Sequence, residues 1–231
     1  MVSDGAGVRR ALSGFSDAEL ERYARHIVLK EVGGAGQAAL KAARVLVVGA
    51  GGIGSPAIQY LAAAGVGNLY VADDDTVDLS NLQRQTLFGT GDVGKGKAAT
   101  AVDAMERLNG DIRPGGFGVR FDTESAADIL ALIRADVILD GTDSFAARLF
   151  IADTALGHRI PLVSAAVAGF EGQLAVYRGW EANKPCYRCF VGADPDRVDT
   201  NCADTGVLGA LAGVMGSLAA LEVIRAITGF G

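Results

Sequence analysis

The sequence predicts an α/β fold with a doubly wound, mainly parallel sheet, an N-terminal helix and an antiparallel extension toward the C-terminal side. Two observations predict it. Short apolar runs of strand length alternate with helical segments of roughly 10 residues. The first apolar run also leads straight into a glycine-rich loop, as a buried parallel strand does before a phosphate-binding turn. The predicted architecture is therefore Rossmann-like.

The first expected element is a helix that begins after Ser16. Ser16 and Glu19 have the spacing of a capping box, and the helical segment SDAELERYARHIVLK extends over 16–30. Residues 1–14 lack the continuous apolar stretch of a signal peptide, so we expect them to be flexible and the protein to be cytoplasmic.

The other elements follow in chain order. Strands are expected at 44–48, 68–72, 119–121, 137–139, 161–164 and, in the antiparallel direction, 172–177. Helices are expected after the glycine loop up to Gly65, and then at 96–108, 125–133, 144–156 and 207–227. No linker rich in Pro, Ser or charge divides the chain, so residues 1–231 are expected to form a single domain.

Composition excludes several classes. Half of the residues are hydrophobic and 21% are charged, which excludes disorder driven by excess charge. A net charge of −6 argues against a nucleic-acid partner. The longest uncharged stretch, 205–221, is shorter than the ~20 residues that span a bilayer, so we expect a buried helix and no membrane partner. Its Gly and Ala content also suits a homodimer interface.

The glycine loop indicates a nucleotide. Residues 49–54, GAGGIG, fit the pattern G-x-G-x-x-G between a strand and a helix, where backbone can approach a phosphate at the positive end of a helix dipole. Asp73 ends the next strand, where a carboxylate can accept hydrogen bonds from ribose hydroxyls. These residues do not distinguish NAD from ATP, and a tight turn without a ligand stays open.

A polar block follows Asp73. Residues 73–85 read DDDTVDLSNLQRQ, where a dehydrogenase usually continues into a simple helix. Arg84 can bridge phosphates with its planar guanidinium, and Lys97 can add a point charge. The alternative for Arg84 is a solvated loop cation.

These segments together resemble the ThiF/MoeB/HesA adenylyltransferases, the bacterial relatives of ubiquitin-activating enzymes. The resemblance covers 15–229 and rests on motifs in the family's order: RYARH, GAGGIG, DDDTVDLSNLQRQ, Lys97, DGTD at 140–143, CYRC at 186–189 and NCADTG at 201–206. It implies a homodimeric enzyme that uses ATP and Mg²⁺ to adenylate the C-terminal glycine carboxylate of a small ubiquitin-like (β-grasp) sulfur carrier protein ending in Gly-Gly. Thiamin and molybdopterin pathways both stay open.

The resemblance also assigns residues. It implies that ATP is bound by Gly49, Gly51, Gly52, Gly54, Asp73, Asp75, Asn81, Arg84, Gln85, Lys97, Asp143 and Ser144. Arg84, Lys97 and Asp143 would act in catalysis, with Asp143 as the magnesium ligand, and Arg25 would reach into the partner's ATP site. Ser144 departs from the family, which commonly has Asn at this position, so that contact is in doubt.

The cysteines leave alternatives open. Cys186 and Cys189 form half of a zinc site, which a second C-x-x-C completes in the family. This sequence has no second pair, and Cys202, His26 and His158 lack convincing ligand spacing. Zinc binding, loss of the metal, ligands from another chain and a truncated sequence all remain possible. The resemblance makes Cys202 a covalent nucleophile in some members, and the alternative is a small buried apolar residue.

Two other functions are weighed against adenylation. The glycine loop alone also suits an NAD-dependent oxidoreductase, but NLQRQ and the lack of a hydride-transfer set argue against it. A non-catalytic nucleotide-binding relative is the second alternative.

Overall fold

The computed structural model describes residues 12–192 and 206–230. The flexibility expected for residues 1–14 falls largely outside this part. The described helices of at least four residues are α2 (Asp17–Arg22), α3 (Ala24–Ile27), α4 (Gly33–Ala42), α5 (Gly54–Ala64), α6 (Lys97–Leu108), α7 (Ala126–Ile133), α8 (Phe145–His158), α9 (Tyr187–Val191) and α11 (Gly209–Thr228). The strands are β1 (Arg44–Val48), β2 (Asn68–Ala72), β3 (Arg113–Phe117), β4 (Val137–Asp140), β5 (Leu162–Ala168) and β6 (Glu171–Tyr177).

The six strands form one sheet in the order β3-β2-β1-β4-β5-β6. The first five pair in parallel, and β6 pairs antiparallel with β5 along its whole length, from Leu162 opposite Tyr177 to Ala168 opposite Glu171. The predicted mainly parallel sheet with an antiparallel extension is confirmed.

Helices cover both faces of the sheet. They are needed because neighbouring apolar side chains of β1 point to opposite faces. Val45 and Val47 pack in the core that lies under α4, α5, α6 and α11, whereas Leu46 and Val48 pack in the core under α7 and α8. All four side chains are almost fully buried. A strand buried on both faces reads as the continuous apolar run seen in the sequence.

The strand order places a crevice at the carboxyl ends of β1 and β4. The chain leaves β1 toward β2 on one side, and it returns through β4 on the other side. Helices α5 and α8, which follow these two strands, lie on opposite faces of the sheet. Ligands of doubly wound sheets bind at such a reversal of strand order.

One predicted strand was wrong. The strand expected at 119–121 lies instead at β3, whose sequence is Arg-Pro-Gly-Gly-Phe. Pro114 is tolerated because β3 is an edge strand. A Cβ on Gly115 would lie 2.6 Å from the Tyr70 ring. Glycine is rare in strands, and here the close contact with Tyr70 explains why this strand contains one.

The N-terminal region also differs from the prediction. The capping box of Ser16 and Glu19 is present, but the expected single helix is divided at Tyr23 into α2 and α3. The buried Tyr23 hydroxyl accepts a hydrogen bond from Asn109 Nδ2 at 2.8 Å, which anchors the break. Helix α4 was not predicted, because its Gly-Gly-Ala-Gly start has poor helix propensity.

Helix α11 confirms the helix predicted at 207–227, with one face in the core. Ala212, Met215 and Ala219 are buried, whereas Val214 and Leu218 are exposed. By length and composition it is the one helix in the described part that could cross a membrane. It packs against α5 and β5, but only 33% of its most apolar window is buried, so the expected buried helix is buried on one side only.

Candidate functional site

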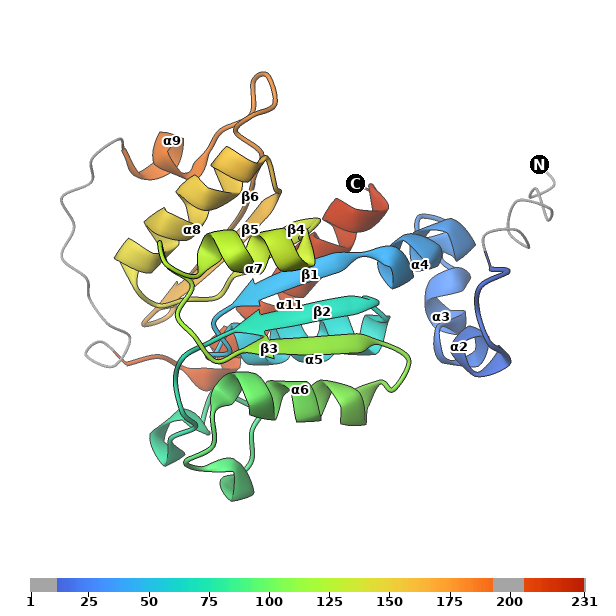
Figure 1. Cartoon of the computed structure of the whole chain (residues 1–231), viewed down its shortest axis with the longest axis horizontal. Helices are drawn as coiled ribbons and strands as arrows, with labels where there is room; N and C mark the ends of the chain where they lie inside the picture. Colours follow the sequence, from blue (N-terminus) through green and yellow to red (C-terminus); the bar gives the residue numbers. More distant parts are fainter. Residues whose placement is uncertain (1–11, 193–205, 231) are drawn as a thin grey trace.

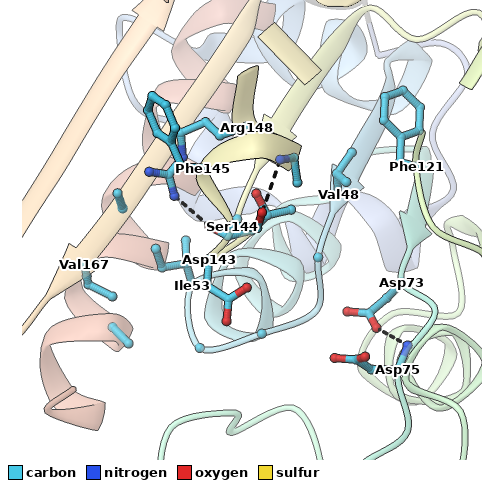
Figure 2. Close-up of a pocket in the computed structure, with 18 of the residues that line it drawn as sticks. Val48, Ile53, Asp73, Asp75, Phe121, Asp143, Ser144, Phe145, Arg148 and Val167 are labelled. Atoms are coloured by element: carbon cyan, nitrogen blue, oxygen red, sulfur yellow. Dashed lines mark hydrogen bonds between the residues drawn. The ribbon is translucent and has the colours of Figure 1, made fainter. Parts of the chain in front are cut away.

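A pocket of about 690 Å³ opens at the carboxyl ends of the parallel strands. The glycine loop, the ends of β2 and β4, the start of α8 and the β5–β6 hairpin line it. Figure 2 shows Asp73 and Asp75 on one side of the glycine loop, and Asp143, Ser144 and Arg148 on the other. The topology therefore brings together side chains from segments that are far apart in the sequence.

The glycine loop is tight on its protein side and open on its pocket side. Gly49 has φ +88°, and a Cβ on Gly54 would overlap the Gly49 carbonyl oxygen. Gly51 differs, because among the described residues its Cβ would meet only the Gly141 oxygen at 3.9 Å. Packing does not explain the missing side chain at Gly51, which lines the pocket and leaves room for a ligand against the backbone.

Asp73 is hydrogen-bonded to the glycine loop. Its Oδ2 accepts from the Ala50 N–H at 2.7 Å, and its Oδ1 accepts from the Asp75 N–H at 2.9 Å. Burial raises the pKa of the Asp73 carboxyl, although the Ala50 N–H and the nearby Lys97 act in the opposite direction. Each oxygen keeps a second lone pair, so the carboxylate can still accept from ribose hydroxyls.

Lys97 begins α6 with its ammonium group buried in the pocket wall. Its side chain is 5% exposed, and Nζ lies 2.8 Å from Asp75 Oδ2. The Asp75 side chain is 66% exposed. The Lys97 ammonium group is thus held at the pocket. Because the Asp75 carboxylate is hydrated, a phosphate can replace it as the partner of Lys97.

Arg84 and Gln85 line the pocket from the loop after β2. The Arg84 stem lies 3.3 Å from the position of a Cβ on Gly52, and Nη1 donates to the Ser80 carbonyl at 3.2 Å. Gln85 is buried, and its Oε1 has no hydrogen-bond partner in the described residues. A buried acceptor without a partner suits a ligand donor such as a hydroxyl or amino group. Asn81 does not line the pocket.

Asp143 and Ser144 lie on the turn between β4 and α8. The Asp143 carboxylate is exposed at the pocket and makes no ion pair or hydrogen bond with any other described side chain. Ser144 is the N-cap of α8, and its Oγ accepts from the Ala147 N–H at 3.3 Å. This hydroxyl has a local structural role at the position where the family commonly has Asn.

Sequence reasoning missed several pocket residues. Arg148 lines the pocket from the first turns of α8, and Phe121 and Gln173 line it from the segment after β3 and from β6. Only Arg148 had a usable signal, since a basic residue follows Asp143 by little more than one helical turn.

Among the described residues, four predicted groups do not line this pocket: Gly54, Asn81, Arg25 and the pair of Cys186 and Cys189. Arg25 is exposed on α3, at the end of the sheet opposite to the carboxyl ends of the strands (Figure 1). Cys202 lies outside the described residues. Cys186 and Cys189 have their sulfur atoms 3.4 Å apart, and Cys186 is the N-cap of the short helix α9.

The described part of the chain does not contain a zinc site. No group of three or more His, Cys, Asp or Glu side chains there could hold a metal ion. His26 Nδ1 lies 3.1 Å from Gln37 Oε1, and His158 ends α8. Two thiols do not satisfy tetrahedral zinc, so further ligands would have to come from elsewhere.

Comparison with known proteins identifies the family. The profile described as the ThiF family matches residues 23–231. The chain therefore belongs to the ThiF family. This confirms the resemblance drawn from the motifs.

Named relatives of this ThiF-family chain act on sulfur carriers. It is 42% identical to the sulfur carrier protein adenylyltransferase of Thermus thermophilus, over 92% of this chain and 79% of that protein. It is 43% identical to the sulfur carrier protein ThiS adenylyltransferase of Escherichia coli, over 93% and 84%. It is 45% identical to the bovine adenylyltransferase and sulfurtransferase MOCS3, over 94% of this chain and 47% of that protein. The ThiF-family chain spans about half the length of MOCS3. The names agree with the adenylyltransferase function expected from the sequence.

Solved structures show the same fold. A crystal structure of E. coli MccB with ATP has a TM-score of 0.74 at 24% identity, and covers 91% of this chain and 64% of MccB. The structure of PaaA also has a TM-score of 0.74 at 24% identity, and covers all of this chain and 76% of PaaA. The Rossmann-like fold class is confirmed.

Proposed function

We propose that this ThiF-family protein uses ATP to adenylate the C-terminal glycine carboxylate of a small ubiquitin-like sulfur carrier. The observation that carries the proposal is the pocket at the strand-order reversal, where an open Gly51 backbone faces two cations, Arg84 and Lys97. The named sulfur-carrier adenylyltransferases among its relatives support the same reaction. A cytoplasmic location stays a prediction.

The reaction needs orientation more than acid–base chemistry. The carrier carboxylate is ionised near neutral pH, so it attacks the α-phosphorus without a general base. A bond forms between the carboxylate oxygen and the α-phosphorus, and the bond from this phosphorus to the bridging oxygen breaks. The electron pair leaves with pyrophosphate. The protein contributes by holding both reactants and by stabilising the charge on the phosphates.

The pocket residues suit these tasks. Asp73 is placed to accept from the ribose hydroxyls, and the Gly51 backbone leaves room for the phosphates at the start of α5. Arg84 offers two parallel N–H groups to phosphate oxygens, and Lys97 adds a buried point charge.

The residues also fit a magnesium ion. Mg²⁺ prefers one or two carboxylates together with phosphate oxygens, and Asp143 is a carboxylate at the pocket without a protein partner in the described residues. Bound there, Mg²⁺ would neutralise negative charge on the phosphates. Asp143 would hold it, and Lys97 and Arg84 would interact with the negative charge of the phosphates as well.

We also propose a homodimer in which Arg25 serves the pocket of the partner subunit. The support is the position of Arg25, exposed and outside the pocket of its own chain. Mixing inactive Arg25→Ala and Arg84→Ala proteins tests it. Each mixed dimer then has one complete pocket, so random exchange of subunits restores about a quarter of the wild-type rate. No recovery after proven exchange contradicts the shared site.

Zinc and Cys202 remain separate proposals. Cys186 and Cys189 supply two thiol ligands, and metal analysis of the purified protein measures whether others complete the site. A covalent adduct between Cys202 and the activated carrier, sensitive to Cys202→Ala, is expected only if this thiol is the nucleophile.

Exchange of labelled pyrophosphate into ATP tests the function. We expect exchange with Mg²⁺ and a carrier ending in Gly-Gly, none with a carrier lacking its last glycine, and none in Arg84→Ala. Comparing thiamin-type and molybdopterin-type carriers names the partner. ATP binding without exchange for any carrier would support the non-catalytic relative instead.

A further inference from the structure

Asp140 is a buried carboxylate with four hydrogen bonds, and it does not line the pocket. It ends β4 and is 0% exposed. Its Oδ1 accepts from the Thr142 N–H at 3.0 Å and from Thr142 Oγ1 at 2.7 Å. Its Oδ2 accepts from Ser164 Oγ at 2.9 Å and from Arg148 Nε at 3.1 Å. A buried carboxylate requires such bonds and a compensating cation, which is Arg148.

Arg148 makes a second hydrogen bond, to the backbone of the turn that follows β4. Its Nη2 donates to the Thr142 carbonyl at 2.7 Å, so one planar guanidinium holds both Asp140 and the turn that follows it. Thr142 immediately precedes Asp143, and on the other side Ser144 caps α8. The backbone is therefore fixed on both sides of Asp143, whose carboxylate itself is left without a protein partner in the described residues.

Tyr187 connects Arg148 to the cysteine-containing helix α9. The Tyr187 side chain is 7% exposed, and its hydroxyl lies near the Arg148 guanidinium. Its ring packs against Tyr177 at 5.6 Å and Phe145 at 6.4 Å between centroids. Helix α9, with Cys186 as its N-cap, thus contacts the residue that fixes the Asp143 turn.

We propose that Arg148 is a positioning residue that holds Asp143 in place for the metal–nucleotide complex, and that Tyr187 makes α9 part of the same support. This rests on the proposed function, in which Asp143 faces the magnesium ion. Arg148 acts through the Thr142 backbone, so its effect is transmitted only while Asp143 is present.

The informative variant is Arg148→Lys. Lysine keeps a positive charge for Asp140, but its single nitrogen cannot reproduce the two directed bonds of the planar group. Thermal unfolding shows whether the variant folds. The main readout is the affinity for ATP measured by calorimetry, once with Mg²⁺ and once with a chelator, because the ratio of the two dissociation constants isolates the metal-dependent part of binding.

We expect the wild type to bind ATP more tightly with Mg²⁺. In Arg148→Lys the gain in ATP affinity from Mg²⁺ should fall by about tenfold, because a misplaced Asp143 carboxylate loses its oriented contacts. Its ATP affinity in chelator should stay within about twofold of the wild type. Tyr187→Phe, which removes only the hydroxyl, should lose a smaller part. Arg44→Lys is the matched control, because Arg44 pairs with Asp136 at 2.7 Å at the start of β1, away from the pocket.

A double-mutant cycle decides between positioning and general destabilisation. If Arg148 acts through Asp143, Arg148→Lys has no further effect on the Mg²⁺-dependent gain in an Asp143→Ala background. An additive effect there, or an unchanged gain in Arg148→Lys, overturns the inference and leaves the proposed function intact. If the wild type binds ATP equally well in Mg²⁺ and in chelator, both the metal role of Asp143 and this inference are contradicted. Pyrophosphate exchange then tests adenylation separately.

Discussion

The Asp73 carboxylate accepts a hydrogen bond from the Ala50 N–H at 2.7 Å and thereby joins the end of β2 to the glycine loop after β1. The same carboxylate is the one expected to bind ribose. Asp73 therefore shapes the glycine loop at the place where the ribose is proposed to bind, and its protonation state would affect both roles.

Asp73→Asn should weaken ATP binding by about tenfold or more, because an amide has one acceptor oxygen where the carboxylate has two. Calorimetric titration with ATP measures this. Asp111→Asn is the control, since Asp111 does not line the pocket and pairs with Arg22 at 3.2 Å. Equal affinity in wild type and Asp73→Asn contradicts the ribose assignment.

The pH dependence of stability should change in the same variant. Burial raises the pKa of Asp73 above its ordinary 3.8. The folded state therefore holds this proton more tightly than the unfolded chain, so the contribution of Asp73 to the free energy of unfolding is fully present below pH 3.8 and is lost as pH rises through the raised pKa. The difference in melting temperature between wild type and Asp73→Asn should follow this change. A difference that is constant with pH contradicts it.

Gly51→Ala and Gly54→Ala should separate binding from folding. A Cβ at 51 meets only the Gly141 oxygen at 3.9 Å, so the fold tolerates it, but it enters the pocket and lowers ATP affinity. A Cβ at 54 overlaps the Gly49 carbonyl oxygen and should cost about 1–3 kcal/mol of stability. Unfolding and ATP titration on both variants check this, and normal ATP binding by folded Gly51→Ala would contradict phosphate contact there.

Lys97→Met should fold and fail in catalysis. Its partner Asp75 is 66% exposed and remains hydrated, so the loss of the ion pair should change stability by less than about 1 kcal/mol. Loss of the buried cation should slow pyrophosphate exchange by about 10²-fold or more. Lys95→Met, which breaks the exposed pair with Asp92, is the control that should retain the wild-type rate.

Ser144→Ala should destabilise the protein by about 1 kcal/mol through loss of the α8 cap, whereas Ser144→Asn should stay near wild type, because Asn caps helices about as well as Ser. Chemical denaturation measures both. Equal stability of the alanine variant would show that the cap at Ser144 contributes little.

The central architecture could be predicted because local signals agree with the fold. The run 44–48 is apolar throughout, the glycine loop marks the turn after it, and Asp73 ends the next strand. Among the elements that could not be predicted are β3 and α4. β3 depends on the fit of Gly115 against the Tyr70 ring, and α4 is rich in glycine, so tertiary contacts override local propensity in both.

The candidate site likewise contains residues that the sequence could predict and residues that it could not. Lys97, Arg84 and Asp143 could be expected from motifs, and the structure brings all three to one pocket. The spacing of Arg148 from Asp143 was a usable signal, but the role proposed for Arg148 could not be found from sequence. It depends on a buried Asp140 whose partners lie on the turn after β4, on α8 and on β5. The role proposed for Arg25 would depend on a second subunit, which no pattern within one chain locates.

Intact-mass analysis of the carrier after incubation with this protein, ATP and Mg²⁺ tests the central claim most directly. The account predicts a carrier bearing AMP on its C-terminal glycine, formed by the wild type and absent with Arg84→Ala. An unmodified carrier of every type tested, with ATP still bound in the wild-type pocket, would contradict adenylation as the function of this site.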